Sequence, residues 1–123
     1  MSDRTDILLV EDEPNIAEAV LFILSRAGWQ VEVIDDGANA MPAIRAIRPR
    51  LVILDLMLPH RSGREILIEL RRETDRALAA TRVLLLTAQG QATDTARLAE
   101  ADAALSKPFA NDDLRALVQR LMA

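Results

Sequence analysis

The chain of 123 residues contains no cysteine, no tyrosine and a single histidine. Without cysteine it can form neither disulfide bonds nor a thiolate metal site. Its longest wholly apolar run, residues 19–24, is far shorter than the roughly 20 residues that a membrane-spanning helix needs. The polar residues at the N-terminus do not resemble a signal peptide, so we expect a cytoplasmic protein with no membrane segment.

Basic residues are also scarce, since 15 Lys and Arg stand against 19 Asp and Glu, for a formal net charge of −4. Nucleic-acid-binding domains usually carry a basic excess, so direct nucleic-acid binding is not expected. Two groups of arginines lie among acidic residues, and we interpret both as solvated helix faces: Arg45, Arg48 and Arg50, and Arg71 and Arg72.

Short apolar runs recur along the chain and predict β-strands. Ile7–Val10, residues 51–54 and residues 83–86 are too short for helices and are rich in branched side chains. They lack polar alternation, which is typical of strands buried on both faces. Val31–Ile34 partly alternates and predicts an edge strand, and residues 103–105 predict a weaker fifth strand.

Helical patterns lie between these strands. Apolar residues from Ile16 to Ala27 recur at helical spacing and are followed by Gly28, at the position of a C-terminal cap. Further helices are predicted over residues 38–47, after a capping box at residues 62–65, over residues 93–101, and from an N-cap at Asn111 through Leu121.

The order strand–helix, repeated five times, predicts an α/β fold. We expect a doubly wound (βα)5 sandwich, in which a five-stranded parallel sheet carries helices on both faces. The length suits a single domain over residues 1–123, with no room for a second folded module. In such sheets ligands bind beyond the carboxyl ends of the strands.

Polar side chains follow four of the predicted strands. Glu11 and Asp12 follow the first, Asp55 the third, Thr87 the fourth and Lys107 the fifth. Each of these residue types is common after a strand for structural reasons alone, because acidic residues suit helix N-termini and Asp suits turns. Together they place three carboxylates, a hydroxyl and an ammonium group at one edge. Hard oxygen ligands without histidine or cysteine favour Mg²⁺ or Mn²⁺.

Four segments together resemble the receiver domain of two-component response regulators, in order and at family spacing. They are residues 9–14 (LVEDEP), 54–59 (LDLMLP), 86–88 (LTA) and 107–109 (KPF). The resemblance implies that Asp55 is a phosphoacceptor. It also implies that the donor is a phosphohistidine on a sensor histidine kinase or a histidine phosphotransfer protein.

The same resemblance implies a role for each site residue. Asp12, Asp55 and the backbone carbonyl of Met57 would ligate Mg²⁺, and Glu11 would act through a bound water. The phosphoryl oxygens would be held by the hydroxyl of Thr87, the backbone N–H of Ala88 and the ammonium group of Lys107. Proteins of this family also hold the bond corresponding to Lys107–Pro108 cis. The downstream partner is an unknown protein, and a homodimer is compatible with the sequence.

Three positions depart from the family pattern. Ala104 stands where an aromatic residue usually lies, three residues before the lysine. We therefore expect output to run through residues 88–92 and the helix after them. Ala103 and Leu117 replace charged residues of the dimer surface of winged-helix regulators, so that dimer is not expected.

We interpret four further residues as packing or solvent-exposed residues without a role in the site. His60, the sole histidine, is interpreted as a solvated loop residue rather than a ligand or phosphodonor. Trp29 and Phe109 are interpreted as packing residues, and Phe22 as part of the core.

Four alternative functions remain open. A phosphatase of the haloacid dehalogenase type needs a carboxylate where Met57 stands. A flavin or nucleotide module of flavodoxin type wants a Gly/Ser/Thr-rich phosphate loop where residues 11–13 are acidic. The chain is also compatible with a docking module of receiver fold, which Ala104 favours, or with the receiver part of a larger DNA-binding or enzymatic regulator.

Overall fold

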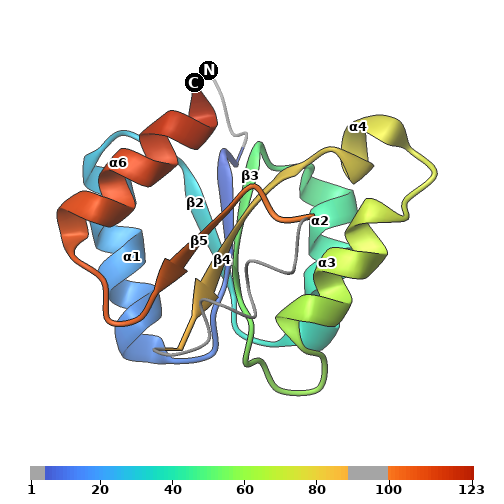
Figure 1. The fold of residues 1–123 in the computed structure, drawn as a ribbon, viewed down its shortest axis with the longest axis horizontal. Coiled ribbons are helices and arrows are strands. Elements are labelled where there is room, and N and C mark those ends of the chain that lie inside the picture. Colours follow the sequence, from blue (N-terminus) through green and yellow to red (C-terminus); the bar gives the residue numbers. More distant parts are fainter. Residues whose placement is uncertain (1–4, 89–99) are drawn as a thin grey trace.

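A five-stranded parallel sheet forms the centre of the computed structural model, which describes residues 5–88 and 100–123 (Figure 1). Its strands lie in the order β2-β1-β3-β4-β5. Their bounds are β1 Ile7–Val10, β2 Val31–Ile34, β3 Leu51–Asp55, β4 Arg82–Thr87 and β5 Ala103–Ser106. All five predicted strands are therefore confirmed, including the edge position of β2.

Helices cover both faces of this sheet, which confirms the doubly wound fold (Figure 1). One face carries α1 (Pro14–Arg26) and α6 (Asn111–Met122). The other carries α2 (Ala40–Ile47), α3 (Gly63–Arg71) and the short α4 (Arg76–Ala79). Within residues 5–88 and 100–123, every helix is too short or too polar to span a membrane.

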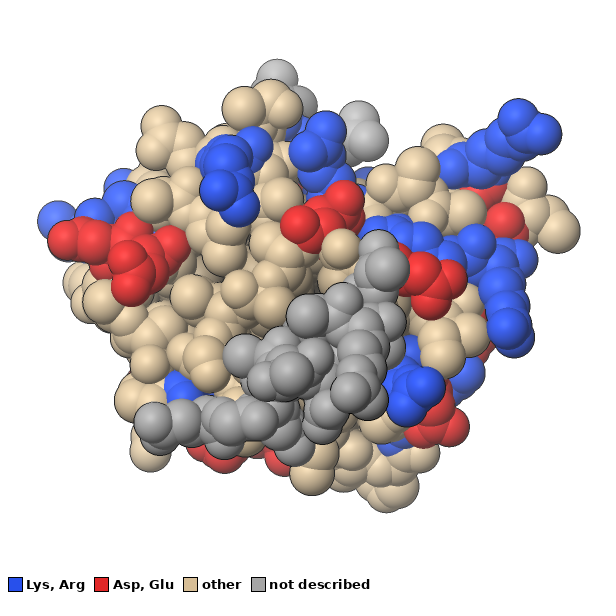
Figure 2. Space-filling model, viewed as in Figure 1, with Lys and Arg blue, Asp and Glu red and all other residues tan. Residues whose placement is uncertain are grey.

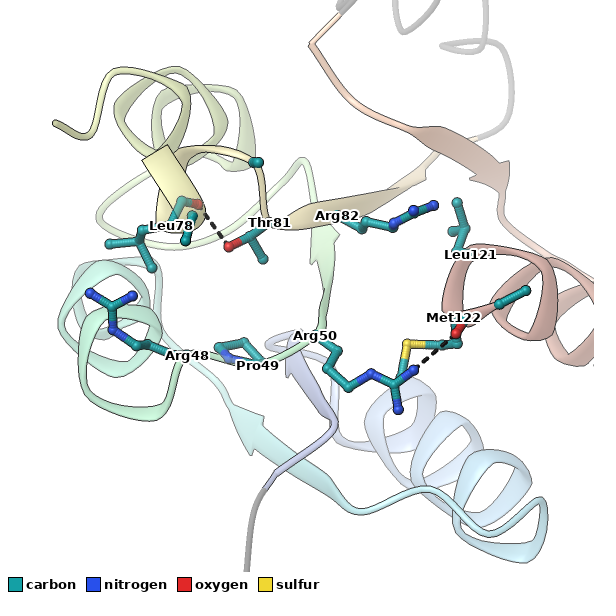
Figure 3. Close-up of a pocket in the computed structure, with 11 residues that line it drawn as sticks. Arg48, Pro49, Arg50, Leu78, Thr81, Arg82, Leu121 and Met122 are labelled. Atoms are coloured by element: carbon teal, nitrogen blue, oxygen red, sulfur yellow. Dashed lines mark hydrogen bonds between the residues drawn. The ribbon is translucent and has the colours of Figure 1, made fainter. Parts of the chain in front are cut away.

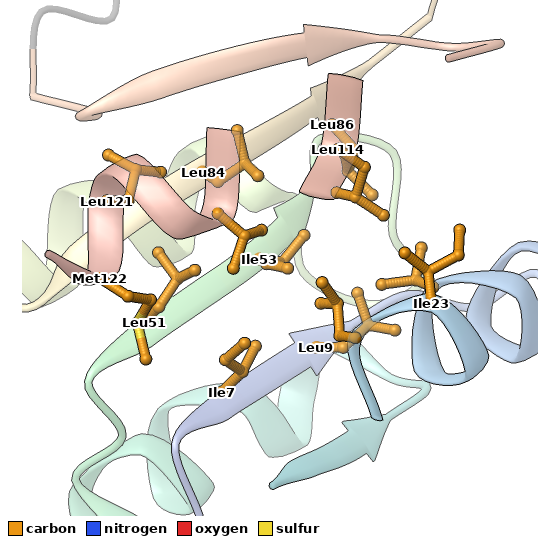
Figure 4. Close-up of a cluster of buried hydrophobic side chains, with 13 residues drawn as sticks. Ile7, Leu9, Ile23, Leu51, Ile53, Leu84, Leu86, Leu114, Leu121 and Met122 are labelled. Atoms are coloured by element: carbon orange, nitrogen blue, oxygen red, sulfur yellow. The ribbon is translucent and has the colours of Figure 1, made fainter. Parts of the chain in front are cut away.

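The core lies in two layers, one on each side of the sheet. Ile7 and Leu9 of β1 pack with alternate residues of β3 and β4 against α1 and α6 (Figure 4). Leu8 and Val10 point the opposite way, toward α2 and α3. Successive side chains of a strand alternate between faces, and both faces are covered. This is why the buried positions of the three central strands are apolar, apart from Asp55 and Thr87 at the carboxyl ends of β3 and β4.

Helix termini agree with the sequence in part. Gly28 follows the end of α1 with φ of 101°, a conformation that glycine adopts without strain. The capping box of α3 is complete, since Ser62 and Glu65 exchange side-chain–backbone hydrogen bonds of 3.2 and 3.0 Å. The prediction of Asn111 as an N-cap is wrong by one residue: Ala110 caps α6, and its carbonyl accepts the Leu114 N–H.

Two other helix predictions change. The segment 38–47 is split into a 3-10 turn, η1 (Gly37–Asn39), and α2, because the Asp36 side chain accepts the Ala38 N–H and fixes a separate first turn. Helix α4 was not predicted; the Asp75 carboxylate caps its four residues. For the helix predicted over residues 93–101, residues 93–99 lie outside the described residues.

The prediction of solvated arginine faces holds for one group and fails for Arg71. Arg45 is exposed and pairs with Glu69 and Glu73 at 2.7 and 2.8 Å. Figure 2 shows basic and acidic side chains interspersed over α3 and α4, while the surface over β5 is largely uncharged. The side chain of Arg71, by contrast, is only 16% exposed. It donates to the backbone carbonyls of Glu100, Ala79 and Thr81.

The interpretation of Phe22 as a core residue is wrong, since it is 62% exposed. On α1 it lies opposite the face that buries Val20 and Leu24, and the Arg26 guanidinium covers its ring at 5.4 Å. Trp29 and Phe109 do pack against the core on the α1 and α6 side, as predicted.

Candidate functional site

Three carboxylates meet at the carboxyl ends of β1 and β3. Val10 and Leu54 are partners in the parallel register, so the next residues, Glu11 and Asp55, lie side by side. Ligand oxygens of Glu11, Asp12 and Asp55 all lie within 4.8 Å of one another. Glu11 and Asp55 are buried and Asp12 is exposed, so solvent reaches the cluster at Asp12.

Lys107 reaches this cluster from the end of β5. Its Nζ lies 3.1 Å from Asp55 Oδ2 and 3.0 Å from Glu11 Oε1. Its backbone N–H donates to the Thr87 carbonyl at 2.7 Å, and the Lys107–Pro108 bond is cis, as the family resemblance implied. Burial alone would lower the pKa of Lys107, but the Glu11 and Asp55 carboxylates outweigh it and raise that pKa above its ordinary value.

Glu11 is the most perturbed acid of the site. Burial raises its pKa to about 7, and the Asp55 charge acts in the same direction. The Glu13 N–H, which donates to Glu11 Oε2 at 3.1 Å, and Lys107 both oppose this rise. Glu11 Oε1 makes no hydrogen bond of good geometry within residues 5–88 and 100–123, although it forms the ion pair with Lys107. Glu11 and Asp55 thus share one ammonium group.

Thr87 ends β4 beside this cluster. It is buried, and its Oγ1 has no hydrogen-bond partner among the described residues. A buried hydroxyl without a partner is costly, and a bound oxyanion would satisfy it. Asp55, Met57, Ala88 and Lys107 line a cleft of about 610 Å³ that continues along α1.

The donor set fits a small divalent cation. Carboxylate oxygens are the ligands that Mg²⁺ prefers, and here three of them converge without histidine or cysteine. The excess negative charge would attract a cation, and the exposed Asp12 gives the cation access from solvent. The Met57 N–H donates to Asp55 Oδ1 at 3.1 Å, and the role of the Met57 carbonyl as a metal ligand stays a prediction.

Sequence reasoning missed one residue that shapes the site. A Cβ on Gly63 would lie 2.3 Å from the Asp55 carbonyl oxygen and 2.9 Å from the Leu56 Cα. Only glycine therefore lets the start of α3 approach the end of β3 this closely. Its place just after the Ser62 N-cap gave no sequence signal of this close approach.

Residues outside the cluster agree with their predicted roles or lie beyond the described chain. His60 is an exposed loop residue, as predicted, and its Nδ1 lies 2.7 Å from Asp36 Oδ2. Ala104 lies exposed on β5. The predicted output segment, residues 88–92, lies outside the described residues except for Ala88. The expectations for Ala103 and Leu117 concern a dimer and stay predictions.

The fold and the acidic site define a class of protein, and comparison with known proteins identifies it. The family model described as the response regulator receiver domain matches residues 7–119, so the chain belongs to that family. It is a response-regulator receiver domain of two-component signal transduction. Membership of this family favours the receiver interpretation over the phosphatase and the flavin module.

Several relatives are full-length regulators. The probable transcriptional regulatory protein TcrX of Mycobacterium tuberculosis is 39% identical over 120 residues, covering 93% of this chain and 50% of TcrX. The DNA-binding response regulator MtrA of Mycolicibacterium smegmatis is 36% identical over 118 residues, covering 94% of this chain and 50% of MtrA. The chain thus spans about half the length of these curated relatives.

Solved structures share the fold. The receiver domain of a signal transduction histidine kinase from Syntrophus aciditrophicus has 34% identity and a TM-score of 0.84, covering 94% of this chain and 88% of that one. The response regulator TrrA of Thermotoga maritima, solved in complex with Mg²⁺ and BeF, has 31% identity and a TM-score of 0.83, covering 95% and 98%.

Proposed function

We propose that Asp55 accepts a phosphoryl group from a phosphohistidine of a sensor histidine kinase or histidine phosphotransfer protein, and that this changes which proteins the domain binds. The observation that carries the proposal is the position of Lys107 Nζ, 3.1 Å from Asp55 Oδ2 inside a cluster of three carboxylates. A buried acid next to an ammonium group and a partnerless hydroxyl suits group transfer to that acid.

The chemistry follows from the residues at the strand ends. An Asp55 carboxylate oxygen attacks phosphorus, the nitrogen–phosphorus bond of the donor breaks, and an acyl phosphate forms while the imidazole leaves. Lys107 neutralises charge on the transferred oxygens. The Thr87 hydroxyl and the Ala88 N–H donate to the remaining oxygens. Positioning and electrostatic stabilisation supply most of the acceleration in such transfers.

Asp12, Asp55 and the Met57 carbonyl would hold Mg²⁺ or Mn²⁺, with Glu11 acting through a bound water. When bound, the ion neutralises charge on the phosphoryl oxygens. The relative TrrA was solved in complex with Mg²⁺ and BeF, which supports Mg²⁺ as the cation. In this chain the buried Glu11 keeps Lys107 oriented toward Asp55, because the ammonium group lies between the two carboxylates.

The wider role is also part of the proposal. We infer one receiver domain over residues 1–123 that works in the cytoplasm and catalyses only its own phosphorylation and dephosphorylation. Its partners would be proteins rather than nucleic acid. The chain covers only half of TcrX and half of MtrA. This coverage favours the alternative that the receiver is part of a longer regulator with a DNA-binding or enzymatic portion.

Intact mass spectrometry tests the assignment of Asp55. The protein is incubated with phosphoramidate and Mg²⁺ beside an Asp55→Asn variant. We expect the mass of one phosphoryl group to be added to the unmodified protein and to be missing from the variant. No added mass on the unmodified protein, with Mg²⁺ binding confirmed separately, would contradict phosphorylation. Equal phosphorylation of the variant would contradict Asp55 as the acceptor.

A further inference from the structure

We propose that a pocket at the end of the sheet opposite Asp55 binds a small molecule that bears a phosphate group. The pocket has a volume of about 440 Å³ and lies between the turn before β3, the α4–β4 turn and the end of α6 (Figure 3). That volume lies in the range of small-molecule sites in proteins. It shares no lining residue with the cleft beside Asp55.

The lining of this pocket is positively charged. Arg48, Arg50 and Arg82 are among its lining residues, and no Asp or Glu in the described part of the chain lines it. This concentration of positive charge stands out in a chain with a formal net charge of −4. The planar guanidinium fork matches the spacing of phosphate oxygens and donates two hydrogen bonds at once.

The three arginines differ in how far neighbouring groups already neutralise their charge. Arg82 forms no ion pair with any residue in the described part of the chain. Arg50 Nη2 donates to the Met122 carbonyl at 2.9 Å, and its Nη1 lies 3.8 Å from the Asp6 carboxylate. Arg48 pairs with the Asp75 carboxylate outside the pocket lining. Arg82 therefore offers the largest uncompensated charge to an incoming anion.

The directions of the side chains suit a ligand held between them. Arg50 and Arg82 come from neighbouring strand starts, because Leu51 and Arg82 are partners in the parallel register. Figure 3 shows both side chains extending toward the end of α6, with Arg48 on the other side of the opening. An anion beside Arg50 and Arg82 would meet guanidinium groups from two neighbouring strands.

Apolar side chains complete the pocket. Leu78, Leu121 and Met122 line it and are 4–7% exposed. Buried apolar residues next to a charged group favour a ligand with an apolar body attached to its phosphate. The proposed ligand class is therefore an organic phosphate, with inorganic phosphate as the simplest member that shares its chemistry.

This pocket can be tested independently of Asp55. Arg82 and Thr87 are the two ends of β4, so the pocket and the phosphoacceptor site are roughly 16 Å apart along the strand. The proposal does not depend on phosphorylation, because its residues take no part in the acidic site. An Asp55→Asn protein in Mg²⁺-free buffer keeps the pocket while removing the acceptor.

The experiment is a titration of ¹⁵N-labelled Asp55→Asn protein with inorganic phosphate, followed by amide NMR shifts. We expect saturable shifts at Arg50, Leu78, Arg82 and Met122. The substitution Arg82→Gln in the same background should weaken binding roughly tenfold or more, since it removes a charged hydrogen-bond donor. The matched control Arg64→Gln, which removes an exposed arginine of α3, should leave binding unchanged.

Shifts that do not saturate, or equal weakening by Arg64→Gln, would overturn the proposal, since either result means general attraction of an anion to exposed arginines. A parallel titration with phenyl phosphate distinguishes an organic phosphate ligand from inorganic phosphate. Tighter binding than inorganic phosphate supports an organic phosphate, and equal binding supports recognition of the phosphate alone. If Arg82→Gln loses its dispersed spectrum, Arg48→Gln replaces it.

Discussion

The Asp102 carboxylate forms a 3.1 Å ion pair with Arg71, and through it the end of α3 is fixed to the residue that precedes β5. The same Asp102 oxygen accepts the Val83 N–H at 2.8 Å. Arg71 is satisfied on its other nitrogens by backbone carbonyls of the α4–β4 turn and of Glu100. One side chain thus connects α3, the start of β4 and the start of β5.

Arg71→Met is expected to lower the free energy of unfolding by roughly 3 kcal/mol. It leaves the Asp102 carboxylate without its ion-pair partner and several carbonyls without a donor. Urea denaturation of the metal-free protein measures the change. Arg72→Met, a substitution of the exposed neighbour, should stay within about 0.5 kcal/mol of the unmodified protein. Similar losses in the two variants would contradict this role of Arg71.

Lys107→Met is expected to slow phosphorylation by phosphoramidate roughly 100-fold, because it removes the ammonium group that faces Asp55 Oδ2. The rate is measured by intact mass at fixed Mg²⁺. Arg120→Met removes one positive charge from the exposed side of α6 and serves as the control. An unchanged rate in Lys107→Met would show that this lysine does not act on the transferred group.

Gly63→Ala is expected to reduce both stability and phosphorylation. Its Cβ would lie 2.3 Å from the Asp55 carbonyl oxygen, so the backbone at the end of β3 must shift. We expect a loss of about 1–3 kcal/mol in the free energy of unfolding, together with a slower rate of mass gain. Arg64→Ala, one residue along α3, should change neither measurement. A Gly63→Ala protein with full stability would argue against this close approach.

Glu11 should make the stability of the metal-free protein depend on pH. Its pKa is raised in the folded state from 4.5 to about 7, so folding favours its protonated form. That contribution is complete below about pH 4.5 and is lost as the pH rises through about 7. The free energy of unfolding should therefore fall across this interval, and Glu11→Gln should reduce the slope. An identical slope in the variant would contradict the assignment.

Much of the fold could be predicted because the strands are buried on both faces. Ile7–Val10 is apolar at every position, and such a run has few other structures open to it. Even the weak strand at residues 103–105 followed from the alternation of elements, and it pairs with β4. It was harder to predict which side of an amphipathic helix faces the core. Phe22 is apolar, yet it lies opposite the buried side of α1.

The candidate site was predictable for a similar reason. Residues that directly follow parallel strands must meet at one edge, which brings Glu11, Asp55 and Lys107 together. The partners of Arg71 were not predictable, because three of them are backbone carbonyls, which no residue type marks in a sequence. The pocket with Arg50 and Arg82 likewise depends on which strand starts are neighbours.

Lys107 is the single lysine of the chain. Its side-chain amine is therefore the one ε-amino group that amine-directed labelling can reach, beside the α-amino group. Reductive methylation with ¹³C-formaldehyde would give a single side-chain resonance, located between Asp55 and Glu11. That resonance would report metal binding and phosphorylation directly at the reacting carboxylate, with no substitution in the protein.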